Sequence, residues 1–226
     1  MTDRRAAILG RISQALGHAA AADAPAVQQR VNDHARGPQP QWTEAPRERF
    51  LAKLAKVAGT HAELASEAEI VGAVADYLAA QTLPQRLCVA PHPLLADVVW
   101  PQGWQVAHRR AQGDDRIGLA VAFCGIAETG SLMLLSGPDS PTTLNFLPDD
   151  FLCLLPEDRI VPRMEDAWAL LRAERGSLPR ATNIITGPSR TADVEQTIQL
   201  GAHGPRRLHV LLTRSVENVR PHGSLE

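Results

Sequence analysis

The chain has 226 residues, of which 44% are hydrophobic and 21% are charged, and its formal net charge at pH 7 is −2. This balance excludes the global basic field of a nucleic-acid-binding protein and the polybasic cluster of a membrane-surface protein. No apolar run approaches the roughly 20 residues that cross a bilayer, and the charged N-terminus lacks the apolar segment of a secretory signal. We therefore expect a cytoplasmic protein with no membrane span and no nucleic-acid partner.

Cysteine and histidine positions argue against a metal centre in this chain. Cys88, Cys124 and Cys153 each lie inside an apolar run, and no Cys-x-x-Cys pair supplies the clustered ligands of a ferredoxin-type iron–sulfur centre. No pair of histidines has the spacing of a zinc motif. The sequence therefore predicts three buried, reduced thiols that react slowly, no metal site, and no cofactor bound by this chain.

The first 42 residues are predicted to form an N-terminal helix followed by a flexible arm. Ile8, Ile12 and Leu16 recur at four-residue spacing, which indicates a short amphipathic helix over residues 3–16. Residues 18–42 have few large apolar side chains, which is typical of a linker. The predicted organisation is thus helix and arm over 1–42, a folded body over 43–214 and a C-terminal tail over 215–226.

The body alternates helices with short apolar strands. Helices are expected over 46–57, 66–78, 94–99 and 162–172, the second opened by the capping box Ser66-Glu67-Ala68-Glu69. Strands are expected over 87–90, 104–108, 117–124, 132–135, 152–155, 183–186 and 208–212. This alternation predicts an α/β domain with a mixed, largely parallel sheet flanked by helices.

A stretch of small and polar residues, 125–131, separates two of the apolar runs. Glu128 is its one carboxylate, Thr129 and Ser131 offer hydroxyls, and the amides around Gly130 are of the kind that bind an anion. One interpretation is therefore a ligand site with Glu128 as its reactive or positioning group. The alternative is a hairpin whose glycines serve only the turn.

A second polar segment, 187–195, follows the strand expected at 183–186. A bend at Gly187 followed by Ser189 and Thr191 indicates a strand that passes into a helix N-terminus, where an anion can bind. Arg190 adds a cation that suits phosphate or carboxylate, and ligands of open α/β sheets bind at such an edge. The alternative is simple capping by Ser189 or Thr191.

His203 lies in the turn before the last strand and is either a hydrogen-bonded structural group or an acid/base. If the strands are parallel neighbours, the loops emerge at one edge of the sheet and form one polar pocket. Glu128 is then the candidate catalytic residue. The candidate ligand-binding residues are Thr129, Gly130, Ser131, Gly187, Ser189, Arg190, Thr191, Asp193 and His203.

Four segments in fixed order resemble the lactate utilization protein C family, which carries the LUD domain. They are Gly-Ile-Ala-Glu-Thr-Gly-Ser at 125–131, Leu-Pro before a hydrophobic strand at 147–155, Gly-Pro-Ser-Arg-Thr-Ala-Asp-Val-Glu at 187–195 and Gly-Ala-His-Gly-Pro at 201–205. The resemblance covers residues 45–213. One departure is that Asp149-Asp150-Phe151 stands where family members often have a histidine.

The resemblance implies a fold similar to that of ribose-phosphate isomerases and CoA transferases, and a role in oxidising L-lactate to pyruvate. It also implies two partner proteins, at least one of which carries iron–sulfur clusters. The favoured function is an accessory or ligand-binding subunit that binds a small anion. The alternative is a stand-alone enzyme for a small carboxylate, phosphate or acyl-CoA, in which Glu128 is the nucleophile or acid/base.

Overall fold

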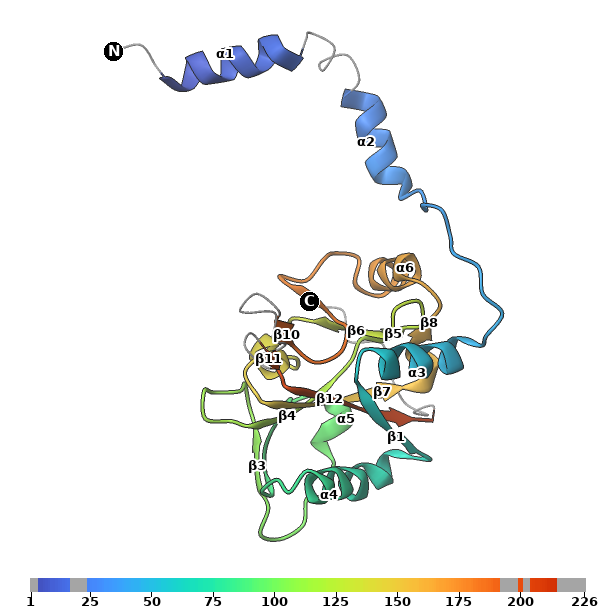
Figure 1. Cartoon of the computed structure of the whole chain (residues 1–226), viewed down its shortest axis with the longest axis vertical. Coiled ribbons are helices and arrows are strands. Elements are labelled where there is room, and N and C mark those ends of the chain that lie inside the picture. The colour runs from blue at the N-terminus through green and yellow to red at the C-terminus, as the bar shows by residue number, and fades with distance from the viewer. Residues whose placement is uncertain (1–3, 17–23, 192–198, 201–203, 215–226) are drawn as a thin grey trace. The chain divides into compact units, whose positions relative to one another are not determined.

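The computed structural model describes residues 4–16, 24–191, 199–200 and 204–214. Its contacts divide the chain into two units, Met1–Trp42 and Thr43–Glu226 (Figure 1). In the first unit, the predicted amphipathic helix is confirmed as α1 (Arg4–Leu16), and its Ile8, Leu9 and Ile12 side chains are exposed. Across the described ranges, no helix combines the length and apolar character needed to cross a membrane.

A second helix, α2 (Ala24–Asp33), occupies part of the segment expected to be a linker. No helix was predicted for these residues, and the flexibility expected of the arm stays a prediction. Gln28 donates to Asn32 over 3.0 Å and Gln29 donates to Asp33 over 2.7 Å, each pair four residues apart. Such pairs stabilise a helix that has no buried apolar face. The hydrophobic pattern of the sequence does not reveal them.

A six-stranded sheet with parallel neighbours throughout forms the centre of the second unit. Its strand order is β1-β12-β7-β4-β2-β3. The central strands β4 and β7 are buried at every residue, as expected for a sheet covered on both faces. The strands are β1 (Thr60–Leu64), β2 (Arg86–Val89), β3 (Gln105–His108), β4 (Ile117–Val121), β7 (Asp150–Pro156) and β12 (Arg207–Thr213).

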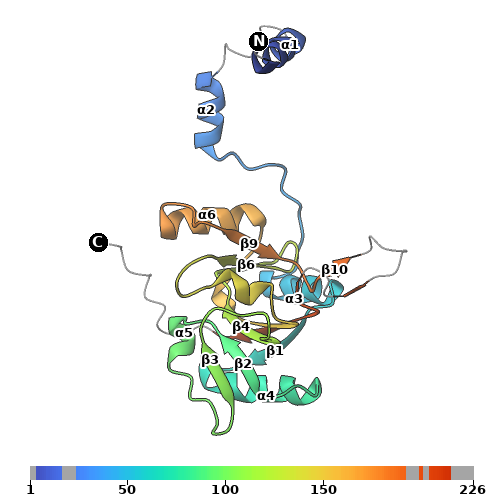
Figure 2. The ribbon, with the colours of Figure 1, turned by 90° about the vertical axis from the view of Figure 1, so that its left-hand side faces the viewer.

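Helices and a second sheet cover the two faces of this central sheet. Figures 1 and 2 show α4 on one face, and α3 with the second sheet on the other; α6 covers the far side of the second sheet. The α/β fold class is confirmed. The remaining helices are α3 (Pro46–Lys56), α4 (Ile70–Ala80), α5 (Pro93–Ala96) and α6 (Met164–Arg175), with short 3-10 turns η2 (Glu67–Glu69), η3 (Thr142–Asn145) and η4 (Glu157–Arg159).

The second sheet is small and mixed, with the order β8-β5-β6-β9. Its strand β6 alternates between two cores: Leu132 and Leu134 belong to the main core, whereas Met133 and Leu135 pack in a smaller core with α6. This is the period-two alternation of a strand that is buried on both faces. The strands are β5 (Cys124–Ile126), β6 (Ser131–Leu135), β8 (Ile160–Val161) and β9 (Thr182–Ile185), and a separate pair consists of β10 (Arg190–Thr191) and β11 (Gln199–Leu200).

Two local predictions are wrong, and one strand was not predicted. The apolar run 117–124 is not one strand, because β4 lies in the central sheet and β5 in the second sheet. Strand β1 was missed, because an edge strand with exposed polar residues has no apolar run. The capping box also differs: the Ser66 side chain makes no capping bond, and the Glu69 carboxylate accepts from the amide of Ala65 over 2.9 Å.

Candidate functional site

Glu128 lies in the turn between β5 and β6, where it holds the start of helix α6. Its amide donates to the Pro162 carbonyl over 2.9 Å, and its carboxylate oxygen Oε2 accepts from the Met164 amide over 3.2 Å. Met164 is the first residue of α6, and the first amides of a helix have no partner within the helix. The half-buried carboxylate therefore satisfies a helix amide, and this bond is a structural role that exists before any ligand binds.

Gly130 brings the same turn into direct contact with helix α3. Its φ is +70°, and a Cβ built on it would lie 2.4 Å from the Leu54 nitrogen and 2.8 Å from the Lys53 Cβ. Its amide donates to the Ile126 carbonyl over 2.9 Å. The glycine is thus required both by the backbone conformation and by the lack of space. The contact also places Lys53, which the sequence did not single out, beside the turn.

Three hydroxyl groups form a hydrogen-bonded chain next to Glu128. Thr129 Oγ1 and Ser131 Oγ are 2.6 Å apart, and Ser131 Oγ is also 2.6 Å from Thr186 Oγ1. Ser131 is buried, whereas Thr129 is half-buried and Thr186 is exposed. The antiparallel pairing of Leu132 with Ile185 brings the start of β6 to the end of β9 and so makes this contact.

The bend after β9 also packs on the end of α3. Gly187 has φ +77°, and a Cβ there would lie 2.5 Å from the Val57 carbonyl oxygen. The Ser189 amide donates to the Pro205 carbonyl over 2.8 Å. The bend does not lead directly into a helix as predicted, because Arg190 and Thr191 form β10. Arg190 is exposed, and the candidates Asp193 and His203 lie outside the described residues.

The turn with Glu128 and the bend with Ser189 therefore meet, but not in the predicted way. They meet through the Ser131–Thr186 contact on antiparallel strands of the second sheet, beside the amino ends of β1 and β12, not at the carboxyl edge of the central sheet. The amides of Glu128, Gly130 and Ser189 are bonded within the protein. An anion at this place would contact hydroxyl groups instead of those amides.

Asp150 occupies the segment that departs from the family pattern, and its buried carboxylate forms an ion pair with the partly exposed Arg207. Arg207 donates to its two carboxylate oxygens over 2.5 and 2.7 Å, and the Tyr77 hydroxyl donates to Oδ1 over 2.7 Å. The neighbouring Asp149 pairs with Arg116 and Arg206 at the surface. Burial and the Asp150 carboxylate raise the pKa of Tyr77. These residues tie α4 to β7 and β12.

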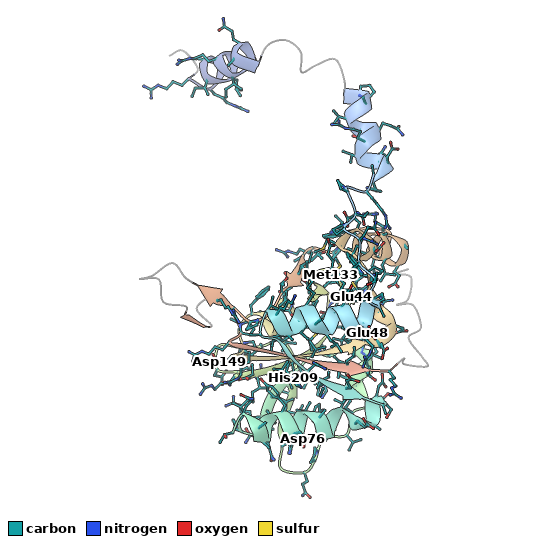
Figure 3. All side chains as sticks on the ribbon, turned by 45° about the vertical axis from the view of Figure 1, so that its right-hand side comes forward. Glu44, Glu48, Asp76, Met133, Asp149 and His209 are labelled. Carbon is teal, nitrogen blue, oxygen red and sulfur yellow. The ribbon has the colours of Figure 1, made fainter. Side chains whose placement is uncertain are left out.

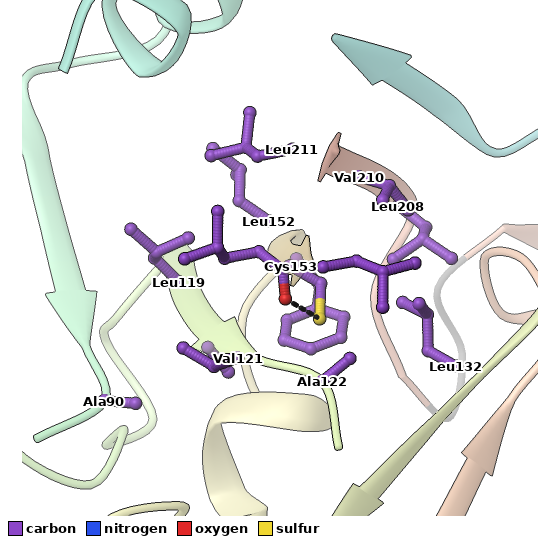
Figure 4. Packing of buried hydrophobic residues seen from close by; sticks show 14 of the residues in the cluster. Ala90, Leu119, Val121, Ala122, Leu132, Leu152, Cys153, Leu208, Val210 and Leu211 are labelled. Carbon is purple, nitrogen blue, oxygen red and sulfur yellow. Dashed lines mark hydrogen bonds between the residues drawn. The ribbon is translucent and has the colours of Figure 1, made fainter. Parts of the chain in front are cut away.

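The three cysteines are free and buried, as predicted. Burial raises the pKa of the Cys124 thiol to about 12 and also raises the pKa values of Cys88 and Cys153. Figure 4 shows Cys153 enclosed by buried hydrophobic side chains. Within the part of the chain that the structure describes, no three His, Cys, Asp or Glu residues are grouped so that they could hold a metal ion.

Comparison with known proteins supports the family resemblance that the four sequence motifs indicated. The LUD domain family model matches residues 47–213. The chain belongs to the LUD domain family. A crystal structure of a DUF162 family protein from Deinococcus radiodurans has the same fold, with a TM-score of 0.56 and 21% identity, covering 76% of this chain and 99% of that one.

Curated relatives match over shorter stretches. A lactate utilization protein C from Anoxybacillus flavithermus is 37% identical over 98 residues, which are 43% of this chain and 44% of that protein. Another from Halalkalibacterium halodurans is 34% identical over 114 residues, or 48% of this chain and 49% of the relative. An uncharacterized protein from Neisseria meningitidis is 39% identical over 94 residues, or 42% and 40%. The matches thus span less than half the length of these relatives.

Proposed function

We propose that this LUD domain protein is a ligand-binding component of a system that oxidises L-lactate to pyruvate. The family match and the relatives named lactate utilization protein C support this role. Electrons removed from lactate must leave through a redox centre, and in this proposal the iron–sulfur clusters of a partner protein supply it. This chain then binds a small anion and presents it to that partner.

The contact between Ser131 and Thr186 carries the proposal, because it joins the two polar segments at one place. Three hydroxyls linked by two hydrogen bonds leave one proton to donate at one end of the chain and lone pairs to accept at the other. Lactate has a carboxylate that accepts hydrogen bonds and a 2-hydroxyl that donates one. The hydroxyl chain of Thr129, Ser131 and Thr186 matches both groups.

The test compares Thr186, which directly follows strand β9, with Thr182 inside that strand. Thr186→Val keeps the shape of the side chain but removes one of the three linked hydroxyl groups, whereas Thr182→Val changes the first residue of β9. We expect Thr186→Val to weaken binding of lactate or pyruvate by at least about tenfold, which is 1.4 kcal/mol, and Thr182→Val to leave it unchanged. Calorimetry with the purified protein measures both. Unchanged binding in Thr186→Val would contradict the proposed site.

The alternative, a stand-alone enzyme, requires Glu128 to leave the Met164 amide before its carboxylate attacks an acyl group. Acyl exchange between CoA and a small carboxylate, catalysed by the isolated protein and abolished in Glu128→Gln, would support that alternative. Copurification with an iron–sulfur protein and lactate-dependent pyruvate formation only in its presence would support the accessory role. The two sets of measurements do not depend on each other.

A further inference from the structure

A cavity of about 620 Å³ lies away from the hydroxyl chain, between edge strand β1 and helix α4. Its walls carry small residues, among them Ala62 on β1 and Gly72, Ala73 and Ala80 on α4. Tyr77 and His209 also line it, with their ring centroids 4.5 Å apart and their ring planes tilted by 33°. Figure 3 shows Asp76 on α4 and His209 on the sheet beside it. The space is therefore a groove bounded by a strand and a helix.

The backbone of β1 is open along this groove. Leu64 turns its carbonyl oxygen toward β12, where it accepts from the Arg214 amide over 3.1 Å. Successive residues of a strand face opposite edges, so the amide and carbonyl groups of His61 and Glu63 face away from β12. Among the described strands, only β12 pairs with β1. An open edge of this kind is a template for another extended segment.

The charged side chains that line the groove indicate what kind of extended peptide segment would bind there. Its acidic lining residues are Glu63, Glu69 and Asp76, its histidine is His209, and the lining contains no lysine or arginine. Glu63 pairs with Arg47 over 2.5 Å, and burial lowers the pKa of His209 to about 4, so its ring is neutral at pH 7. Glu69 and Asp76 are exposed and form no ion pair with any described residue. The groove therefore presents negative charge at its rim and small apolar side chains on its walls.

We propose that β1 and α4 form a docking groove for an extended segment of a partner protein that carries lysine or arginine at its ends. The segment adds a strand beside β1, bonds to the outward groups of His61 and Glu63, and places alternate apolar side chains against the small residues of α4. Strand β1 has five residues, so the paired part of the segment is roughly 16 Å long. A second copy of this chain fits less well, because its own Glu69 and Asp76 would approach those of the first copy.

Labelled heptapeptides test the groove by fluorescence anisotropy at low ionic strength. Each has a core of alternating valine and threonine, and the two end residues are lysine, glutamine or glutamate. We expect the lysine peptide to bind the full-length protein at least about tenfold more tightly than the glutamate peptide. Equal affinity for all three peptides, or no binding of any, would overturn the proposal.

Two variants distinguish strand pairing in the groove from non-specific peptide binding. His61→Pro removes an outward amide, which an edge strand tolerates, whereas the control His61→Ala keeps it. Gly72→Leu fills the groove at a position where no atom lies within 4 Å of the added Cβ, and leucine favours a helix more than glycine does. We expect His61→Pro and Gly72→Leu each to lose at least about tenfold in affinity, with Tm unchanged or raised in Gly72→Leu.

If Gly72→Leu binds the lysine peptide with the wild-type affinity, the peptide does not bind in the groove. This result is decisive even if His61→Pro does not fold. Sedimentation of the wild-type protein gives the remaining comparison. A dimer that His61→Pro converts to a monomer would show that a second copy covers β1, and this result would also overturn the proposed occupant.

Discussion

At the scale of single residues, Gly130 and Gly187 decide how closely the two polar loops approach helix α3. Both have positive φ, and in both a Cβ would lie within 2.6 Å of α3-side backbone atoms, namely the Leu54 nitrogen and the Val57 oxygen. A glycine with the same conformation but free space is Gly176, at the end of α6, with φ +66° and no atom within 4 Å. The three positions therefore separate backbone strain from steric contact.

We expect Gly176→Ala to cost about 1–2 kcal/mol of unfolding free energy, because only the left-handed conformation is penalised. Gly130→Ala should cost clearly more, since its Cβ also displaces the backbone of α3 and pulls the hydroxyl chain apart. Urea denaturation of the two variants measures the difference. Equal losses would mean that the turn moves away from α3 at little cost.

The stability of the folded protein depends on pH through His209, a residue of β12 that lines the groove. It is 7% exposed, its Nδ1 lies 2.8 Å from Thr60 Oγ1, and burial lowers its pKa to about 4. The unfolded state, with an ordinary pKa near 6.5, binds a proton at a pH where the folded state does not. This contribution to stability is therefore complete above about pH 6.5 and is lost as the pH falls toward 4.

We expect the wild-type unfolding free energy to fall by roughly 2–3 kcal/mol more than that of His209→Phe between pH 7 and pH 4. Phenylalanine keeps an aromatic ring beside Tyr77 but has no proton to bind. Urea titrations of both proteins across this range give the difference, in which the titration of surface carboxylates cancels. Parallel curves for the two proteins would show that His209 does not drive the loss.

At the scale of elements, helix α6 is joined to the turn between β5 and β6 by one carboxylate. Glu128 accepts from the first amide of the helix, and Asp166 accepts from the Arg163 amide just before it over 3.1 Å. Carboxylates near a helix N-terminus also interact favourably with the helix dipole. Glu128 is also the candidate catalytic residue, so the variants must distinguish its structural role from a catalytic role.

Glu128→Gln retains an oxygen that accepts from Met164, so we expect it to lose less than about 1 kcal/mol of stability, whereas Glu128→Ala should lose about 1–2 kcal/mol. Thermal unfolding of both variants measures this order. If Glu128 only holds the helix, Glu128→Gln keeps full lactate-dependent activity. Loss of activity in Glu128→Gln with an unchanged Tm would show that the charge itself is used by the ligand or the reaction.

At the scale of the whole molecule, the family match and the large hydrophobic cores fall in the second unit. The LUD match covers 47–213, and every buried hydrophobic residue of the two cores lies between Phe50 and Leu212. In the first unit, exposed large apolar side chains include Ile8, Val27 and Val31. The second unit therefore contains the apolar burial that stabilises a folded domain.

We expect a chain that begins at Thr43 to fold independently, with a Tm within about 2–4 °C of the full-length value, which corresponds to about 1 kcal/mol for a domain of this size. Differential scanning calorimetry of the two proteins measures the shift. A much lower Tm for the shortened protein would show that the first unit stabilises the body, and would contradict its description as an arm.

Hydrophobic pattern predicted those parts of the fold whose burial is continuous along the chain. The strands near 152–155 and 208–212 and the helices near 46–57 and 162–172 were found because their apolar residues repeat with the period of a strand or a helix. Strand β1 and helix α2 were not predicted, because an edge strand and an exposed helix carry polar residues on their surfaces and show no hydrophobic pattern. In the run 117–124, burial continues across the point where the chain leaves one sheet for another, so the pattern gave no sign of the change.

The order of motifs by itself indicated the family, and the alternation of helices with apolar strands indicated the α/β class, because the type of each residue and its spacing are properties of the chain alone. Tertiary structure decided where the candidate residues meet. The bond between Ser131 and Thr186 joins residues 55 positions apart and depends on the register of β6 with β9, which local pattern does not encode. Likewise, only packing assigned the Glu128 carboxylate to the Met164 amide and the Asp150 carboxylate to Arg207, since hydrogen-bond partners are chosen by distance in the folded protein.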